Sequence, residues 1–223
     1  MQEFYYCERM DASFFAEPMN AFTNVFFIIA AYMSYKYLHK NTPNTKAKTS
    51  IYILNFILIA IGLGSFLWHT IALPWSMLAD VIPITLFMYV YLFSFVYYVL
   101  QKKLYVAVLA LFVFSFVNYG VESYVDKDLF NGSISYAPAL ISLFILALFS
   151  KNKKHLSLFL SAIFVFLLSL VFRSIDFFLC ESFSFGSHFL WHICNASMLY
   201  MLLIFLMRSS VKTLKKTTSL TVI

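Results

Sequence analysis

The sequence contains few charged residues and few of the residues that build long loops. Charged residues make up 12% of the 223 positions, whereas hydrophobic residues make up 62%. Typical soluble domains carry about 25% charged residues. Glycine and proline number five each, and cysteine three, which leaves little material for long irregular connections. This composition excludes an ordinary water-soluble domain and suits a lipid bilayer.

We expect the first residues not to be a signal peptide, and the sequence shows no internal repeats. Residues 1–17 have no basic start of the secretory type, because they carry several acidic residues against the single Arg9. We expect residues 1–17 to form a short extracytoplasmic lead-in. No low-complexity segment divides the chain and no unit recurs at a fixed period, so we predict one domain over residues 1–223.

Long apolar segments account for most of the chain. There are seven, at 18–38, 51–69, 77–100, 104–120, 134–149, 156–172 and 187–207. A helix of about 20 residues crosses the hydrocarbon core of a bilayer. Strands of a membrane barrel alternate apolar and polar residues, and these segments do not. The sequence therefore predicts an all-α bundle of seven transmembrane helices, in which the fifth and sixth extend into flanking sequence.

The basic residues gather on one side of this predicted bundle. Seven crossings place 13 of the 16 lysines and arginines on the side opposite the N-terminus. These are Lys36, Lys40, Lys46, Lys48, Lys102, Lys103, Lys151, Lys153, Lys154, Arg208, Lys212, Lys215 and Lys216. The positive-inside rule makes that side cytoplasmic, so the N-terminus lies outside and residues 209–223 form a basic cytoplasmic tail. The net charge of +6 then indicates anionic lipid headgroups, not nucleic acid, as the partner.

Titratable residues from three predicted helices meet at one depth. His69 ends the second segment, His188 and His192 begin the seventh, and Asp80 lies one turn inside the third. Residues four apart share a helix face, and a pair of histidines at this spacing is a known way to bind zinc. Three protein ligands leave a fourth position for water, as in catalytic zinc sites. Ser65 precedes His69 by one turn and lies on the same face.

Each of these residues also has a plainer interpretation. A histidine at a membrane interface can be an ordinary hydrogen-bonded polar residue, and a pair at this spacing can arise by chance. Asp80 can form a structural ion pair with Arg173, and Ser65 can bond a backbone carbonyl of its own helix. Ionisable residues inside membrane segments are nevertheless costly, and they are usually functional.

Three short blocks of residues occur in order along the chain. They are Cys7-Glu8 with Ala16-Glu17-Pro18-Met19-Asn20 and Thr23-Asn24, then Gly64-Ser65 with His69 and Asp80, then His188-x-x-Trp191-His192. Together they resemble the alkaline ceramidase family, in the superfamily that includes the adiponectin and progestin receptors. The resemblance implies a seven-helix zinc amidase that cleaves ceramide, or another N-acyl membrane lipid, to a long-chain amine and a fatty acid.

The resemblance also assigns roles to individual residues. It implies that His69, His188 and His192 hold zinc. Asp80 and Ser65 would flank the water that zinc activates, with Asp80 accepting its proton and passing it to the leaving amine.

The family pairs an N-terminal cysteine with one that precedes the last helix. Cys7 and Cys180 occupy these positions, so the resemblance implies a disulfide between them, with two free thiols as the alternative. Cys194 lies within the last segment, where we expect it to be packed and inert.

The family further binds calcium near the N-terminus, and here the match is partial. Glu8 and Glu17 correspond to family ligands, and Asp11 is a candidate substitute for a missing one. Tyr5 and Met10, however, stand where the family has an aspartate and an asparagine. The alternative is an acidic, solvated lead-in without calcium.

Two other classes of function compete with an amidase. A receptor-like protein of the same superfamily would keep the zinc site and bind lipid without turnover, although it would need neither Asp80 nor Ser65. A transporter would carry a pair of helices broken by glycine or proline near the middle of the membrane, and the sequence has no such pair.

Overall fold

The computed structural model describes residues 6–42, 44–150 and 153–211. No strand occurs among these residues, which confirms the all-α class predicted from the sequence. Some predicted features lie outside the described residues: Tyr5, Lys151, Lys212, Lys215, Lys216 and most of the basic tail 209–223.

The helices follow the predicted apolar segments closely. In chain order they are α1 (Pro18–Thr23), α2 (Val25–Asn41), α3 (Lys48–Ile71), α4 (Pro74–Ser94), η1 (Phe95–Val99), α5 (Leu104–Tyr124), η2 (Ser133–Tyr136), α6 (Ala137–Phe149), η3 (Lys153–His155), α7 (Leu156–Ser174), α8 (Asp176–Leu179) and α9 (His188–Ser209). Asn24 alone separates α1 from α2, and its backbone is itself right-handed helical. The first predicted segment therefore corresponds to α1 and α2 together.

Five helical segments of the described chain are long and apolar enough to cross a membrane. These are Lys48–Ile71, Pro74–Val99, Leu104–Tyr124, Lys153–Ser174 and His188–Ser209. The helices α2 and α6 are shorter, with 17 and 13 residues. The protein is thus an all-α membrane bundle, and seven crossings remain a prediction.

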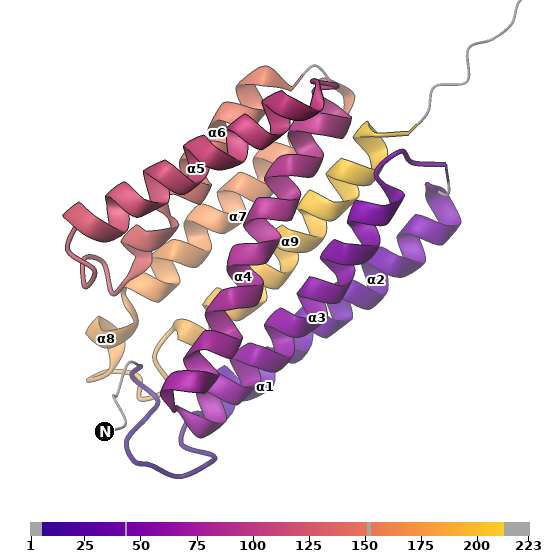
Figure 1. Ribbon diagram of the computed structural model, residues 1–223. Coiled ribbons are helices and arrows are strands. Elements are labelled where there is room, and N and C mark those ends of the chain that lie inside the picture. The colour runs from indigo at the N-terminus through magenta and orange to yellow at the C-terminus, as the bar shows by residue number, and fades with distance from the viewer. Residues whose placement is uncertain (1–5, 43, 151–152, 212–223) are drawn as a thin grey trace, which may run out of the picture.

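The long helices run side by side as one bundle (Figure 1). The described start of the chain, α1 and α8 lie at one end, and the C-terminal end of α9 lies at the other. The consecutive helices α3 and α4 pack against each other, while α9 packs on both α2 and α7. Most of α9 is buried, and so is its first turn. That turn lies at the end of the bundle that carries α1 and α8, which we call the N-terminal end of the bundle.

The outer surface of the bundle is apolar. On α5, only Ala107 and Phe114 are buried, whereas large side chains such as Phe112 and Phe116 are 69% and 78% exposed. A surface of this kind is unfavourable in water and matches the hydrocarbon of a bilayer. The side chains therefore place α5 against lipid.

A glycine allows α3 and α4 to approach closely. A Cβ atom added to Gly64 would overlap the backbone carbonyl of Ala79 in α4. Small residues permit this kind of close helix contact in membranes. The contact brings Ser65, the next residue of α3, beside Asp80, the next residue of α4.

Candidate metal-binding active site

Three histidines converge at the N-terminal end of the bundle. His69 belongs to the last turn of α3, while His188 and His192 lie in the first turns of α9. One nitrogen from each ring lies within 4.8 Å of the others, and all three side chains are buried. Among the described residues, these three histidines form the one group of three or more metal-ligating side chains close enough to share an ion. The three histidines could hold a metal ion.

The hydrogen bonds of the three rings fit a metal ligand set. His69 Nδ1 lies 2.5 Å from Glu17 Oε2, and its Nε2 is buried without a partner. His192 Nδ1 lies 3.0 Å from the Thr23 hydroxyl oxygen, which leaves Nε2 for a ligand bond. His188 Nδ1 is also buried without a partner. Unpaired buried nitrogens are costly, and a bound metal ion would satisfy them.

Sequence reasoning missed Glu17 as a partner of His69. A carboxylate that accepts the Nδ1 proton fixes the tautomer of a histidine and aims Nε2 at the metal. Burial alone would raise the pKa of Glu17, but His69 and the hydrogen bonds from His69, Arg9 and Asn20 lower it overall. The Glu17 carboxylate is therefore able to accept the Nδ1 proton of His69. Its place in the first sequence block was the available signal, although nothing in that block points to His69.

Thr23 supports His192 in the same way, and sequence reasoning missed it too. The Thr23 hydroxyl donates its one proton to the backbone carbonyl of Met19 at 2.7 Å. It can then only accept from His192 Nδ1, which sets the tautomer of that ring. Thr23 comes from α1, so the N-terminal helix supports the ring of a residue 169 positions further along the chain.

Ser65 and Asp80 lie beside the histidines. The Ser65 side chain lies beside Asp80, and Asp80 is an electrostatic neighbour of His69. Ser65, Asp80 and His192 line the same cavity. The structure thus brings together all five residues that the sequence suggested for metal binding and catalysis.

The cavity beside these residues is mostly apolar. Its volume is about 80 Å³, and it is partly open to the surroundings. Apolar side chains such as Phe87, Leu143 and Leu202 line it. From His192 to Leu202, α9 rises by about 15 Å, so the cavity extends well below the histidines.

A cationic side chain lies close to Asp80. The Arg173 guanidinium lies over three aromatic rings, 6.0 Å from the centroid of Tyr6, 5.8 Å from Tyr136 and 5.4 Å from Trp191. Arg173 and Asp80 interact electrostatically, although no direct ion pair joins them in the described part of the chain. Burial raises the pKa of Tyr6, which therefore remains a hydrogen-bond donor next to Arg173.

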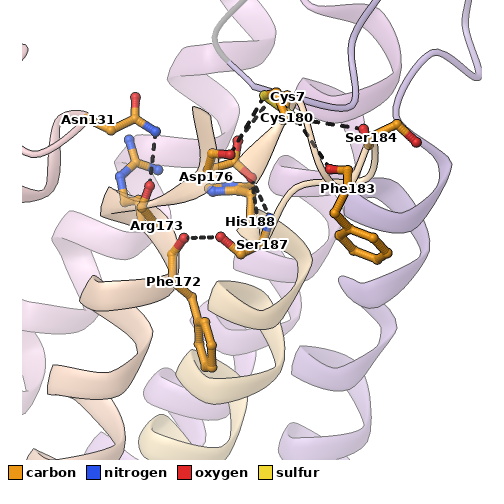
Figure 2. Close-up of a disulfide and its surroundings, with 10 residues drawn as sticks. All are labelled: Cys7, Asn131, Phe172, Arg173, Asp176, Cys180, Phe183, Ser184, Ser187 and His188. Carbon is orange, nitrogen blue, oxygen red and sulfur yellow. Dashed lines mark hydrogen bonds between the residues drawn. A yellow bond between two sulfur atoms is a disulfide. The ribbon is translucent and has the colours of Figure 1, made fainter. Parts of the chain in front are cut away.

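A disulfide joins the N-terminal segment to the loop before α9. It links Cys7 to Cys180, which are 173 residues apart in sequence (Figure 2). Cys194 in α9 is a free cysteine. The disulfide holds the segment that carries Glu17 against the end of the bundle where α9 starts.

Asp176 reinforces this connection, and sequence reasoning did not identify it. Its buried carboxylate accepts hydrogen bonds from the backbone N–H groups of Cys7 at 3.0 Å, Ser187 at 2.7 Å and His188 at 2.9 Å (Figure 2). A carboxylate at a helix N-terminus also complements the helix dipole. Gly186, with φ of +60°, makes room for it, because a Cβ there would overlap the Asp176 carboxylate. These contacts set the position at which α9 begins, and hence that of His188.

The three candidate calcium ligands have other partners. Glu8 accepts hydrogen bonds from the backbone N–H groups of Met19 at 2.7 Å and Asn20 at 2.9 Å, so it caps the start of α1. Glu17 binds Arg9, Asn20 and His69. Asp11 is exposed and accepts a hydrogen bond within its own loop. No cluster of metal-ligating side chains includes them within the described residues.

Comparison with known proteins gives the family of the chain. No curated protein matches the chain. The family whose description is Ceramidase matches residues 3–223, a range that includes the N-terminal block, the Ser65 to Asp80 region and both histidines of α9. The match covers nearly the whole sequence, and the chain belongs to the ceramidase family.

Proposed function

We propose that this protein is a membrane-embedded, zinc-dependent amidase that hydrolyses the N-acyl amide of ceramide or a similar lipid. The observation that carries the proposal is the convergence of His69, His188 and His192 beside Ser65 and Asp80, at the wall of an apolar cavity. Membership of the ceramidase family supports ceramide as the substrate class.

The ligand set favours zinc. Imidazole nitrogens suit zinc, and three protein ligands with an open fourth position are typical of its catalytic sites. When bound, zinc polarises a carbonyl group and lowers the pKa of a water molecule towards about 7. Glu17 and Thr23 would keep the His69 and His192 rings in the tautomer that exposes Nε2.

Asp80 is the residue placed to move the proton. It would accept a proton from the attacking water as the water oxygen bonds to the acyl carbon. It would return that proton to the nitrogen as the carbon–nitrogen bond breaks, which yields a fatty acid and a long-chain amine. Ser65, which lies beside Asp80, would turn its hydroxyl towards the developing oxyanion when substrate is present.

The apolar lining of the cavity is where we place the first part of the acyl chain of the lipid. This lining runs below the histidines along α9, while Asp80 and Ser65 lie at the histidine level. A lipid bound in this way places its amide beside the metal ligands and its chain among side chains such as Phe87 and Leu202. The substrate then need not leave the membrane.

The test is incubation of the purified, zinc-loaded protein with a panel of N-acyl lipids, followed by mass spectrometry of free fatty acid and elemental analysis of zinc. We expect fatty acid release by the wild type, and loss of both zinc and turnover in the His188→Ala/His192→Ala variant. Full zinc in that variant would refute the ligand assignment. A zinc-containing wild type that releases no fatty acid from any lipid would favour the receptor-like alternative.

We also propose that the N-terminal end of the bundle faces away from the cytoplasm. The support is the distribution of basic residues between the two sides of the predicted bundle. A reporter fused after Ile223 should be active only in the cytoplasm. Activity of the same fusion only outside the cytoplasm would reverse the orientation.

A further inference from the structure

A buried arginine binds the carboxylate that supports His69. Arg9 and Glu17 are 3% and 2% exposed, and Arg9 Nε donates to Glu17 Oε1 in an ion pair. Arg9 Nη2 donates to the backbone carbonyl of His69 at 2.9 Å, and Nη1 to that of Asp11 at 3.4 Å. The guanidinium therefore binds the backbone of His69 directly, and it is linked to the His69 ring through Glu17.

A buried carboxylate needs a compensating positive charge, because an unpaired buried charge is strongly destabilising. A bound divalent cation can supply that charge, and so can a guanidinium, which is always protonated and donates in several directions within one plane. At Glu17 the structure contains the second solution. Three hydrogen bonds engage the carboxylate: Oε1 accepts from Arg9, and Oε2 accepts from His69 and Asn20.

Within the described residues, the surroundings of Glu17 do not fit calcium. A calcium ion takes six to eight oxygen ligands. Both oxygens of Glu8 already accept backbone N–H groups, and the Asp11 carboxylate is exposed. Met10 offers no oxygen from its side chain, which is 85% exposed. A divalent cation here would also be repelled by the Arg9 guanidinium.

We infer that Arg9 is a built-in cation that replaces a bound calcium ion, and that it positions His69 for metal binding without calcium. Arg9 holds the Glu17 carboxylate in place, Glu17 accepts the proton of His69 Nδ1, and His69 Nε2 is thereby directed at the other two histidines. The part of this inference that concerns zinc rests on the proposed function. The part that concerns calcium does not.

Calcium independence can be tested on the wild-type protein. Equilibrium dialysis against radioactive calcium should show no stoichiometric binding, and millimolar calcium should leave the midpoint of thermal unfolding unchanged, because a ligand that binds the folded state raises it. Stoichiometric calcium binding, or a rise in the midpoint, would overturn the inference. This measurement needs neither zinc nor turnover.

The positioning role can be tested by zinc affinity, measured by competition with a chelator. The variant Arg9→Met keeps a long side chain without the charge, and we expect its zinc affinity to fall about 10- to 100-fold, as for other residues that orient metal ligands. Arg9→Lys should recover part of this loss. Arg208→Met is the matched control. It removes an exposed arginine that lies in the last turn of α9 and donates a hydrogen bond to the Tyr37 hydroxyl.

The outcomes separate positioning from plain stability. If Arg9→Met lowers the unfolding midpoint but its folded fraction binds zinc as tightly as the wild type, Arg9 is not a positioning residue and the inference fails. If Arg9→Met does not fold, Arg9→Lys decides: zinc binding weaker than in the Arg208→Met control supports the role, and equal binding refutes it. A wild type that binds no zinc would refute the proposed function, while the calcium measurement would still decide whether Arg9 replaces a bound cation.

Discussion

Replacing Asp80 with asparagine separates proton transfer from metal binding. The asparagine side chain has nearly the same size and keeps an oxygen beside Ser65, but an amide cannot take up the proton of an attacking water. Asp80 is not one of the three converging ligands, so Asp80→Asn should retain zinc. The substitution also removes a negative charge that interacts with His69 and Arg173.

The expected loss of turnover follows from the role of a general acid–base group. Such groups contribute about 10²- to 10⁴-fold to rate, which corresponds to about 2.7–5.4 kcal/mol of transition-state stabilisation. The assay is fatty acid release from a lipid amide, with zinc content and unfolding midpoint measured on the same preparation. Asp128→Asn is the control, because it makes the same chemical change at an exposed position near the end of the bundle that carries the site.

Two results would refute this reasoning. Turnover close to that of the wild type would show that Asp80 does not shuttle the proton. Loss of zinc from Asp80→Asn would instead make Asp80 a fourth ligand. A site closed by four protein ligands is typical of structural zinc, so that outcome would favour the receptor-like alternative.

The remaining predictions concern helix packing, the disulfide and the ligands. Gly64→Ala should lower the free energy of unfolding by about 1–3 kcal/mol, because its Cβ overlaps the backbone of α4; thermal unfolding should show no such loss for Gly120→Ala, whose Cβ meets nothing within 4 Å. Joint replacement of Cys7 and Cys180 by serine should cost about 2–5 kcal/mol of unfolding free energy, and peptide mapping that finds both thiols free in the wild type would contradict the bond. His69→Ala should lose both metal and turnover, unlike Asp80→Asn, as elemental analysis and the fatty acid assay can show.

The helices of this protein could be located from the sequence because their signal is local. A long apolar run in a bilayer must satisfy its backbone hydrogen bonds internally, so it forms a helix whatever its neighbours are. The predicted segments 104–120 and 156–172 lie within the observed helices Leu104–Tyr124 and Leu156–Ser174. The number of crossings does not follow from local signals alone, because α6 has only 13 residues.

The depth of the site residues also follows from the order of the segments. Successive helices of a bundle run in opposite directions, so the end of α3, the start of α4 and the start of α9 lie at one end. The sequence alone therefore places His69, Asp80, His188 and His192 at a common level. The tertiary structure adds the close contact at Gly64 that brings the backbones of α3 and α4 together.

The partners that orient the histidines were decided only by tertiary structure. Glu17 and His69 are 52 residues apart, and Asp176 and Cys7 are 169 apart. Sequence reasoning assigned Glu17 to calcium because the family pattern names it as a ligand, and it gave Arg9 no role. Whether a side chain meets a metal ion, an arginine or a histidine depends on how each helix is rotated about its axis and on the path of the segment before α1. Those are set by packing across the whole bundle, and no stretch of neighbouring residues encodes them.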